Sequence, residues 1–160
     1  MENRCYINRI MFVCHGNICR STMAEFVMRD LVNRAGLADR FVIASSATST
    51  EEIGNDTYPG TKRVLAAHGV PVTPRGAVQL RAADYDAYDL FIGMDSANIR
   101  NMRRMLKGDP QNKVHKLLEY PEGVSTDEAS DVADPWYTGD FDTTYTDVLS
   151  GCETLLAMLR

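Results

Sequence analysis

Residues 10–21, IMFVCHGNICRS, join a short apolar run to a loop-like segment that contains a cysteine, a glycine and an arginine. The run IMFV has the length and composition of a strand that is buried on both faces of a parallel sheet. From residue 21 onward the apolar side chains recur at the spacing of an amphipathic helix, at Met23, Phe26, Val27 and Leu31. The stretch therefore predicts a strand, a tight loop and a helix in direct succession.

The rest of the chain continues this alternation. Further strands are expected at 41–44, 88–94 and 114–118, and further helices at 62–68 and 96–107. A closing helix is expected from the apolar stripe of Val148, Cys152, Leu155, Leu156 and Leu159. Strands that alternate with helices favour a parallel sheet with helices on both faces, and such sheets bind ligands beyond the carboxyl ends of their strands. We expect residues 1–160 to form a single domain.

The composition narrows the class of protein. The chain has 160 residues, of which 44% are hydrophobic and 24% charged, and a net charge of −5. These values are typical of a globular domain and do not favour a nucleic acid partner, which needs a wide basic surface. No stretch is long and apolar enough to span a membrane, so no membrane partner is expected. Cysteines at 5, 14, 19 and 152 show no zinc-ligand spacing, and reduced thiols in the cytoplasm are the simplest interpretation.

The loop between the predicted strand and helix has the features of an anion site. Backbone N–H groups between His15 and Arg20 can turn inward, and the following helix adds its positive dipole end. Gly16 is expected to allow backbone conformations and a close approach that a side chain would block. Arg20 carries a planar guanidinium that can bind two phosphate oxygens at once.

The same positive field is expected to act on Cys14. Helix N-termini and nearby cations stabilise a thiolate, so Cys14 is expected to be an ionised nucleophile at neutral pH. The hydroxyl of Ser21 can donate a hydrogen bond to the sulfur. The alternative is a structural buried cysteine beside an unrelated arginine. The flanking strand and helix, together with Gly16 and Asn17, favour the catalytic interpretation.

The segment VCHGNICRSTMAE (13–25) resembles the signature of the low-molecular-weight protein tyrosine phosphatases. Further segments resemble the family in the same order, namely SSATSTEEIGN (45–55), HGV (68–70), MD (94–95) and DPWY (134–137). The resemblance implies a three-layer α/β domain of the flavodoxin-like type, with a four-stranded parallel sheet in the order 2-1-3-4. It also implies hydrolysis of phosphotyrosine proteins or peptides through a phosphocysteine, without metal or cofactor, and with inorganic phosphate as product.

The resemblance assigns further roles. Asp134 matches the family's general acid, and Pro135 restricts the backbone beside it. Asn17 matches an asparagine that braces the loop through hydrogen bonds, and Ser45 matches a serine of the same network. The family's usual histidine partner is missing here, and Pro74 or Arg75 stands roughly in its place.

Specificity is expected to come from the side chains around the phosphate site. Trp136 and Tyr137 match an aromatic wall for the substrate ring. Glu51 aligns with the opposite wall, which is often aromatic in the family, and His15 occupies a position that is commonly aliphatic. Glu51 is expected to disfavour acidic residues near the phosphotyrosine. Ile18 replaces the threonine of related protein-arginine phosphatases and favours an aryl ring over a guanidinium.

Three other interpretations concern the thiols and the loop. A thiol-dependent arsenate reductase needs two further cysteines, but none lies between 20 and 151, and Cys152 belongs to an apolar stripe. A non-catalytic phosphate-binding module is disfavoured because nucleophile, arginine and acid are all present. Cys19 either fills space behind the loop or forms a disulfide with Cys14 that shelters the nucleophile from irreversible oxidation.

Overall fold

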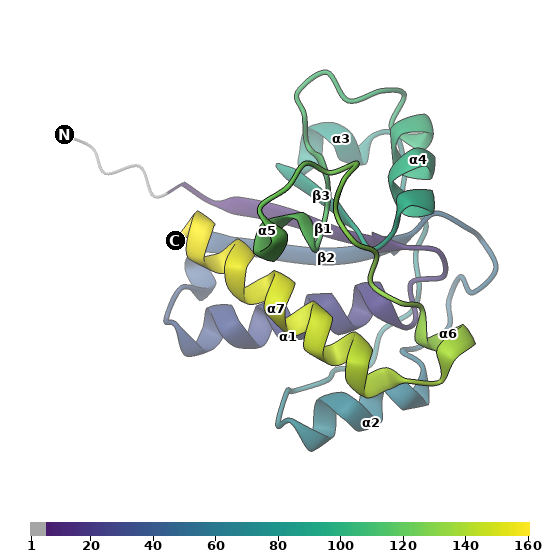
Figure 1. The fold of residues 1–160 in the computed structure, drawn as a ribbon, viewed down its shortest axis with the longest axis vertical. Helices are drawn as coiled ribbons and strands as arrows, with labels where there is room; N and C mark the ends of the chain where they lie inside the picture. The colour runs from purple at the N-terminus through teal and green to yellow at the C-terminus, as the bar shows by residue number, and fades with distance from the viewer. Residues whose placement is uncertain (1–5) are drawn as a thin grey trace.

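The computed structural model describes residues 6–160, so Cys5 lies outside the described part of the chain. The strands are β1 (Asn8–Cys14), β2 (Phe41–Ala47), β3 (Leu90–Gly93) and β4 (Val114–Lys116). The helices are α1 (Arg20–Arg34), a 3₁₀ turn η1 (Ala38–Arg40), α2 (Pro59–Ala67), α3 (Asp84–Ala87), α4 (Ser96–Met105), α5 (Glu119–Glu122), α6 (Pro135–Thr138) and α7 (Phe141–Leu159). Figure 1 shows the strands running through the middle of the molecule between two groups of helices.

The four strands form one parallel sheet in the order β2-β1-β3-β4, which confirms the predicted topology. β1 lies between β2 and β3, with Ile10 opposite Ile43 on one side and Leu90 on the other. Because all strands point the same way, the last residue of β1, Cys14, lies at the carboxyl edge of the sheet beside Ala47. This is the edge at which a ligand was expected.

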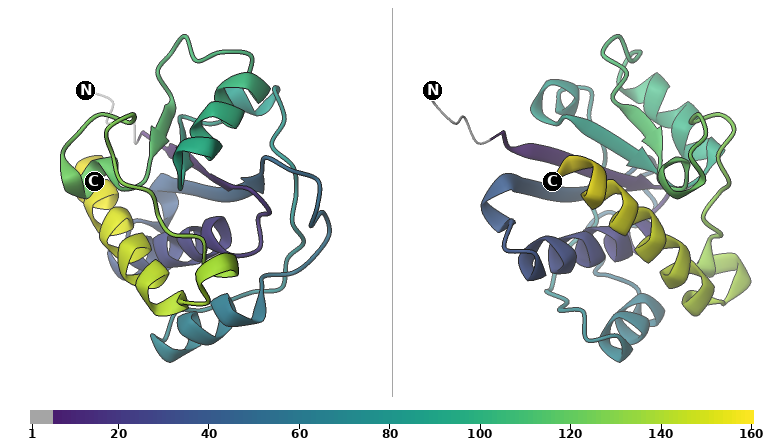
Figure 2. Two further views of the ribbon diagram at one scale, coloured as in Figure 1. Left: turned by 45° about the vertical axis from the view of Figure 1, so that its right-hand side comes forward. Right: turned by 60° about the vertical axis from the view of Figure 1, so that its left-hand side comes forward.

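Alternate side chains of β1 enter two separate cores, one on each face of the sheet. Ile10 and Phe12 pack into the larger core with residues of α1, α2 and α7. Met11 and Val13 pack into a smaller core with residues of α3 and α4. The two views of Figure 2 show these two groups of helices covering opposite faces. The expected three layers are therefore present.

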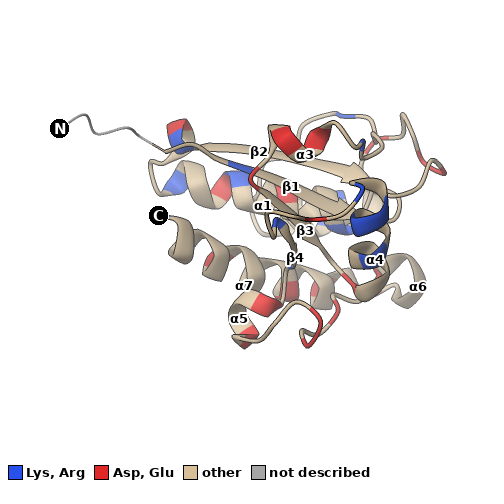
Figure 3. Ribbon diagram, turned by 90° about the horizontal axis from the view of Figure 1, so that it is seen from above, with Lys and Arg blue, Asp and Glu red and all other residues tan. Residues whose placement is uncertain are grey.

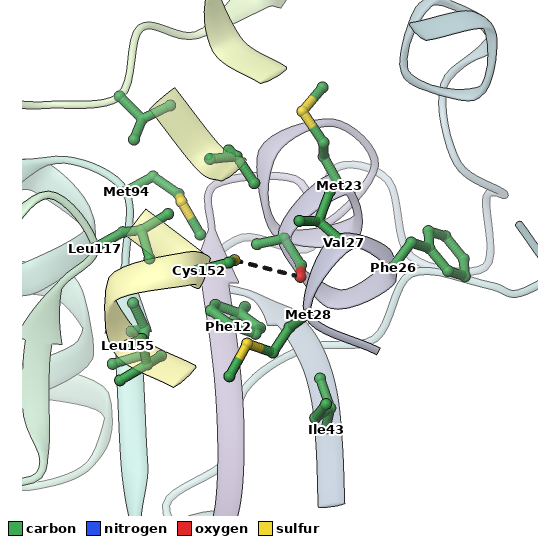
Figure 4. Close-up of a cluster of buried hydrophobic side chains, with 14 of the residues drawn as sticks. Phe12, Met23, Phe26, Val27, Met28, Ile43, Met94, Leu117, Cys152 and Leu155 are labelled. Carbon is green, nitrogen blue, oxygen red and sulfur yellow. Dashed lines mark hydrogen bonds between the residues drawn. The ribbon is translucent and has the colours of Figure 1, made fainter. Parts of the chain in front are cut away.

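The larger core depends on a close approach of α7 to α1 and to the turn after β4 (Figure 4). Cys152 is fully buried there, and its thiol donates to the carbonyl of Ala24 at 3.8 Å. Gly151 is next to it, and a Cβ at this position would come within 2.4 Å of Leu117. The glycine thus permits a contact that any other residue would block. The apolar stripe predicted around Cys152 is confirmed as a core surface.

The segment boundaries differ from the expected ones where local geometry decides them. α2 begins earlier than predicted because Pro59, which needs no N–H partner, starts its first turn. α4 ends before the expected residue 107, since Lys107 already has a left-handed backbone with φ of 59°. The short helices α3, α5 and α6 were not predicted, because four residues are too few for an apolar period to appear.

Charge is unevenly distributed over the surface. Figure 3 shows lysine and arginine gathered on α4, where Arg100, Arg103 and Arg104 are exposed. Arg103 is paired with Asp127 across 3.4 Å. Among residues 6–160, no helix has both the length and the apolar character that crossing a membrane requires.

Candidate active site

The loop from β1 to α1 forms the floor of a pocket of about 110 Å³ at the carboxyl edge of the sheet. Its walls come from the loop after β2 and from the segment around α6. The lining residues are Cys14, His15, Gly16, Ile18, Cys19, Arg20, Glu51, Glu52, Asp134, Trp136 and Tyr137. The structure therefore brings together the nucleophile, arginine, acid and wall residues that the sequence singled out, although Arg20 and Asp134 are 114 residues apart.

Cys14 lies at the bottom of this pocket and is almost completely buried. Its sulfur shares a hydrogen bond with the hydroxyl of Ser21 at 3.1 Å and accepts one from the backbone N–H of Asn17 at 3.3 Å. The backbone N–H groups of Gly16, Ile18 and Cys19 donate to no protein acceptor within the described residues. They are therefore free to donate to an anion, and the anion site expected from the strand–loop–helix pattern stays a prediction.

Asn17, rather than Gly16, carries the unusual backbone conformation of the loop. Asn17 has a φ of 59°, in the left-handed region, whereas Gly16 is not among the residues with positive φ. The conformational freedom expected of Gly16 is therefore not used, and this part of the expectation was wrong. A Cβ at Gly16 would meet only Glu52, at an ordinary contact distance of 3.4 Å. The strain lies at Asn17, where a non-glycine residue needs partners to hold it.

A buried hydrogen-bond network surrounds Asn17. Its amide nitrogen donates to the hydroxyls of Ser21 at 2.8 Å and Ser45 at 2.9 Å. Ser45 donates in turn to the carboxylate of Glu25 at 2.6 Å. Because Asn17 fills one acceptor position of the Ser21 oxygen, the hydroxyl hydrogen of Ser21 is free to point at a thiolate. Arg75 binds the opposite end of the Asn17 side chain.

Arg20 is held from behind by residues of two other segments. Its Nη1 donates to Asp95 at 2.8 Å and to the carbonyl of Val132 at 3.0 Å. Both N–H groups of Nη1 are thereby used, which leaves Nε and Nη2 for a ligand in the pocket that Arg20 lines, with Nη2 3.4 Å from Asp134. Burial opposes the charge, but the negative charges of Cys14, Asp95 and Asp134 outweigh it and raise the pKa of Arg20. Arg20 thus presents a fixed, fully charged fork.

Asp134 caps the one-turn helix α6, which Pro135 begins. One carboxylate oxygen accepts from the backbone N–H of Trp136 at 3.1 Å, and the other is turned toward Arg20. The segment before Asp134 is anchored by Lys116, whose buried ammonium donates to the carbonyl of Ala129 and to Asp131 at 2.8 and 2.9 Å. The carboxyl group is therefore held over the loop by its neighbours.

The side walls of the pocket differ in character. Trp136 and Tyr137 are 54% and 84% exposed, which agrees with their expected place on the surface. The ring of Tyr58 supports Trp136 edge to face, with 5.3 Å between the ring centroids. On the other wall, the imidazole of His15 pairs with the carboxylate of Glu51 at 3.0 Å. An aromatic wall thus faces a polar one.

The two other described cysteines are buried thiols. Burial, followed by the charge of Cys14, raises the pKa of Cys19 to about 12, and Cys19 is one of the residues that line the pocket. Burial also raises the pKa of Cys152, which packs in the core. Cys14, Cys19 and Cys152 are all free in the described chain.

Sequence reasoning missed several residues that shape the pocket. Asp95 was noticed only as part of a family-like segment, although an acidic residue at the carboxyl end of a neighbouring strand is a signal for this edge. Lys116 and Tyr58 carried no local signal, since a lysine at the end of a short strand and a tyrosine before a proline are common. Glu25 lies among helical apolar residues, where a charged residue hints at a buried partner.

Comparisons with known proteins agree with this architecture. Residues 9–160 match the family model described as low molecular weight phosphotyrosine protein phosphatase. The chain is 36% identical to the low molecular weight protein-tyrosine-phosphatase YfkJ of Bacillus subtilis over 151 residues, covering 94% of this chain and 95% of that protein.

Solved structures give the same result. The crystal structure of YfkJ from Bacillus subtilis superposes with a TM-score of 0.89, covering 98% of this chain and 96% of the other. That of SP-PTP, a low molecular weight protein tyrosine phosphatase from Streptococcus pyogenes, has a TM-score of 0.84 at 37% identity, covering 96% and 94%. The chain therefore belongs to the family of low molecular weight phosphotyrosine protein phosphatases.

Proposed function

We propose that this phosphatase hydrolyses phosphotyrosine in proteins and peptides through a phosphocysteine formed on Cys14. The observation that carries the proposal is the position of three groups around one small pocket. The sulfur of Cys14 lies at its floor, the free edge of Arg20 beside it, and an oxygen of Asp134 3.4 Å from that guanidinium. A phosphate that fills this space has a nucleophile below it and an acid next to its ester oxygen.

The first step transfers the phosphoryl group to sulfur. The Cys14 thiolate attacks phosphorus and the bond from phosphorus to the tyrosine oxygen breaks. Arg20 and the loop amides bind the nonbridging oxygens, whose charge they stabilise in the transition state. Asp134 donates its proton to the departing phenolate. Neutral tyrosine and a phosphocysteine result.

The second step regenerates the enzyme. Water attacks the phosphocysteine on the face that tyrosine has left, and Asp134 accepts a proton from it. The bond from sulfur to phosphorus breaks, and inorganic phosphate leaves. Cys14 departs as a thiolate, which Ser21 and the N–H of Asn17 stabilise by the hydrogen bonds already present. The positive charge comes from the loop and Arg20, so no metal or other cofactor is needed in these steps.

The pocket walls support an aryl substrate. Trp136, backed by Tyr58, offers a ring against which the tyrosine can pack. Ile18 is buried at the loop and places an apolar surface on the lining, which suits a phenyl ring better than a guanidinium. We place the enzyme in the cytoplasm, where reduced thiols persist. Phosphotyrosine proteins are its proposed partners, and neither nucleic acid nor membrane is among them.

A comparison of phosphotyrosine, phosphoserine and phosphoarginine peptides tests the proposal. Wild type is expected to prefer phosphotyrosine, and Cys14→Ser is expected to abolish turnover. Asp134→Ala is expected to lower kcat for phosphotyrosine by about 10²–10⁴-fold. The loss is expected to be smaller for para-nitrophenyl phosphate, whose leaving group needs less protonation. Asp39→Ala, an exposed carboxylate of η1, serves as the matched control.

The outcomes separate the alternatives. Preference for phosphoarginine would assign the chain to the protein-arginine phosphatases instead. Turnover that depends on arsenate and a thioredoxin-type reductant would favour the reductase. An equal loss of activity in Asp134→Ala with both aryl esters would remove the general acid from the mechanism.

A further inference from the structure

The left-handed residue of the loop, Asn17, is fully buried, and both ends of its side chain have partners. Its amide nitrogen orients the hydroxyls of Ser21 and Ser45. Its side-chain oxygen accepts from Arg75 at 2.8 Å and from the N–H of Val78 at 3.2 Å. A non-glycine residue in this conformation persists only where its surroundings hold it. The geometry at the sulfur therefore depends on what fixes Asn17.

Arg75 is the residue that holds Asn17 most completely. Its Nη2 donates to the side-chain oxygen of Asn17, and its Nη1 donates to the backbone carbonyl of the same residue at 3.1 Å. The planar fork thus grips both carbonyl groups of one residue that lies 58 positions away in the chain. Lysine, with a single nitrogen, cannot reproduce this pair of directed bonds.

The segment that carries Arg75 is itself fixed. The backbone N–H of Arg75 donates to Asp56 at 3.2 Å, and the N–H of Ala77 donates to the carbonyl of Asn55 at 2.8 Å. Gly76 lies against Gly54, where a Cβ would come within 3.1 Å of the backbone oxygen. The fork is therefore presented by a paired loop rather than by a mobile side chain.

The positive charge of Arg75 also interacts with the sulfur of Cys14. Burial lowers the pKa of Arg75, while the negative charges of Glu25 and Cys14 oppose that effect. Arginine remains protonated throughout the pH range in which proteins are folded. Glu25 is buried in the same network, and Arg29 binds its carboxylate at 2.9 Å. With Glu25 neutralised by Arg29, Arg75 adds a positive charge that favours the thiolate.

We propose that Arg75 is a positioning residue for the nucleophile: by gripping Asn17 it sets the Ser21 hydroxyl and the Asn17 N–H against Cys14, and its permanent charge favours the ionised sulfur. Arg75 does not line the pocket and touches no substrate in this role. The inference rests on the proposed function of Cys14. Arg75 stands roughly where the family usually has a histidine. Because an arginine does not lose its proton at neutral pH, the positive charge beside Asn17 is present at every working pH.

The test is the pH dependence of Cys14 alkylation by iodoacetamide, which reports the thiolate without any turnover. The variants are Arg75→Gln, which removes the charge, and Arg75→Lys, which keeps the charge but not the fork. Arg81→Gln is the matched control, because Arg81 lies on the same connecting segment with its side chain 77% exposed. Thermal unfolding of each variant is measured in parallel.

In Arg75→Gln, the midpoint of alkylation is expected to move to higher pH, and kcat/KM for para-nitrophenyl phosphate at pH 6 is expected to fall roughly 10- to 100-fold. Arg75→Lys is expected to have an alkylation midpoint closer to that of wild type than Arg75→Gln has, but to recover less of the lost kcat/KM. Arg81→Gln is expected to match wild type in both. Within each variant, the pH profile of kcat/KM follows the alkylation profile.

An unchanged alkylation profile in folded Arg75→Gln would overturn the proposal, even if its melting temperature fell, because a merely structural role moves stability and not the midpoint. Failure of the proposed function gives a different pattern. Wild type would then show a normal thiolate profile at Cys14 but no turnover of aryl phosphates, and the alkylation comparison would still decide the role of Arg75.

Discussion

Arg20 and Asp95 form an ion pair of 2.8 Å although they are 75 residues apart in the chain. Asp95 lies two residues after the end of β3 and accepts from the N–H of Asn98, so it also caps α4. One carboxylate therefore starts a helix and orients the guanidinium that faces the pocket. The proposed phosphate site therefore depends on a residue that does not line the pocket.

Asp95→Asn is expected to keep the cap on α4, since asparagine is as good a capping residue, but to lose the charge that anchors Arg20. We expect kcat/KM for aryl phosphates to fall roughly 10- to 100-fold and the inhibition constant of inorganic phosphate to rise. Asp95→Ala loses the cap as well, and its free energy of unfolding is expected to fall by about 1 kcal/mol. Steady-state kinetics and urea denaturation measure the two effects. Full activity in Asp95→Asn would show that Arg20 needs no anchor.

Glu51 is expected to select against acidic substrates. It lies at the pocket with its side chain 70% exposed, paired with His15, and Glu52 lies beside it. Glu51→Ala is expected to raise kcat/KM by about two- to fivefold for phosphotyrosine peptides with acidic flanks. For peptides with basic flanks it is expected to lower kcat/KM. The difference should shrink at high salt. Glu153→Ala, on α7 away from the pocket, is the control. Equal kinetics on both peptide sets before and after substitution would refute this role.

Cys19 is expected to protect Cys14 from irreversible oxidation. Peroxide converts a thiolate to a sulfenic acid, and a neighbouring thiol can displace water from it to form a disulfide. Because the pKa of Cys19 is raised to about 12, we expect this closure to be faster at alkaline pH. The measurement is the activity that dithiothreitol restores after peroxide treatment, which should be lower in Cys19→Ser. Equal recovery in wild type and Cys19→Ser would leave Cys19 as a packing residue.

His115 is expected to make stability depend on pH. Its two ring nitrogens face Glu119 at 3.1 Å and the carbonyl of Asn112 at 2.9 Å, so both must carry hydrogen. The hydrogen bond to Glu119 raises the pKa of His115 above its ordinary 6.5, against the effect of burial. Burial opposes the charge of Glu119, but bonds from His115, Thr126 and the N–H of Lys116 outweigh it and lower its pKa below 4.5.

The His115–Glu119 pair therefore contributes fully to the free energy of unfolding between about pH 4.5 and 6.5. The contribution of His115 is lost as pH rises through its raised pKa. His115→Gln is expected to be less stable than wild type by about 1 kcal/mol at pH 6, with the difference shrinking toward pH 9. Urea denaturation at several pH values measures how the free energy of unfolding of wild type and of His115→Gln changes with pH. A constant difference across this range would mean that the His115 charge is not involved.

The features that the sequence predicted well are those that depend on residues close together in the chain. Cys14 and Arg20 belong to one strand–loop–helix unit, so their meeting follows from local geometry. Asp134 was found through its resemblance to a family segment, since nothing local separates it from the other acidic residues. The sheet order followed from the same resemblance, whereas the alternation of strands and helices indicated only a parallel sheet covered on both faces.

The features that the sequence did not predict depend on contacts between distant segments. Arg75 was noticed only as an irregularity, and its grip on Asn17 requires the loop after α2 to pair with residues 53–56. Lys116 is fully buried because three acceptors surround its ammonium, one from α4 and two from the segment after α5. Gly16 was expected to supply the backbone conformation that a side chain would block, but Asn17 has the left-handed backbone, and the network around Asn17 offsets its strain.

The hold of Val132 and Asp95 on Arg20 has a consequence for the order in which the chain is made. Cys14 and Arg20 leave the ribosome early in synthesis. Asp95 and Val132, which orient the guanidinium of Arg20, leave it much later. Until the segment around Val132 docks, the nascent chain has the Cys14 thiol but only part of the contacts that orient Arg20. We therefore expect products that end before residue 132 to lack the proposed activity, because Val132 and Asp134 are both missing from them.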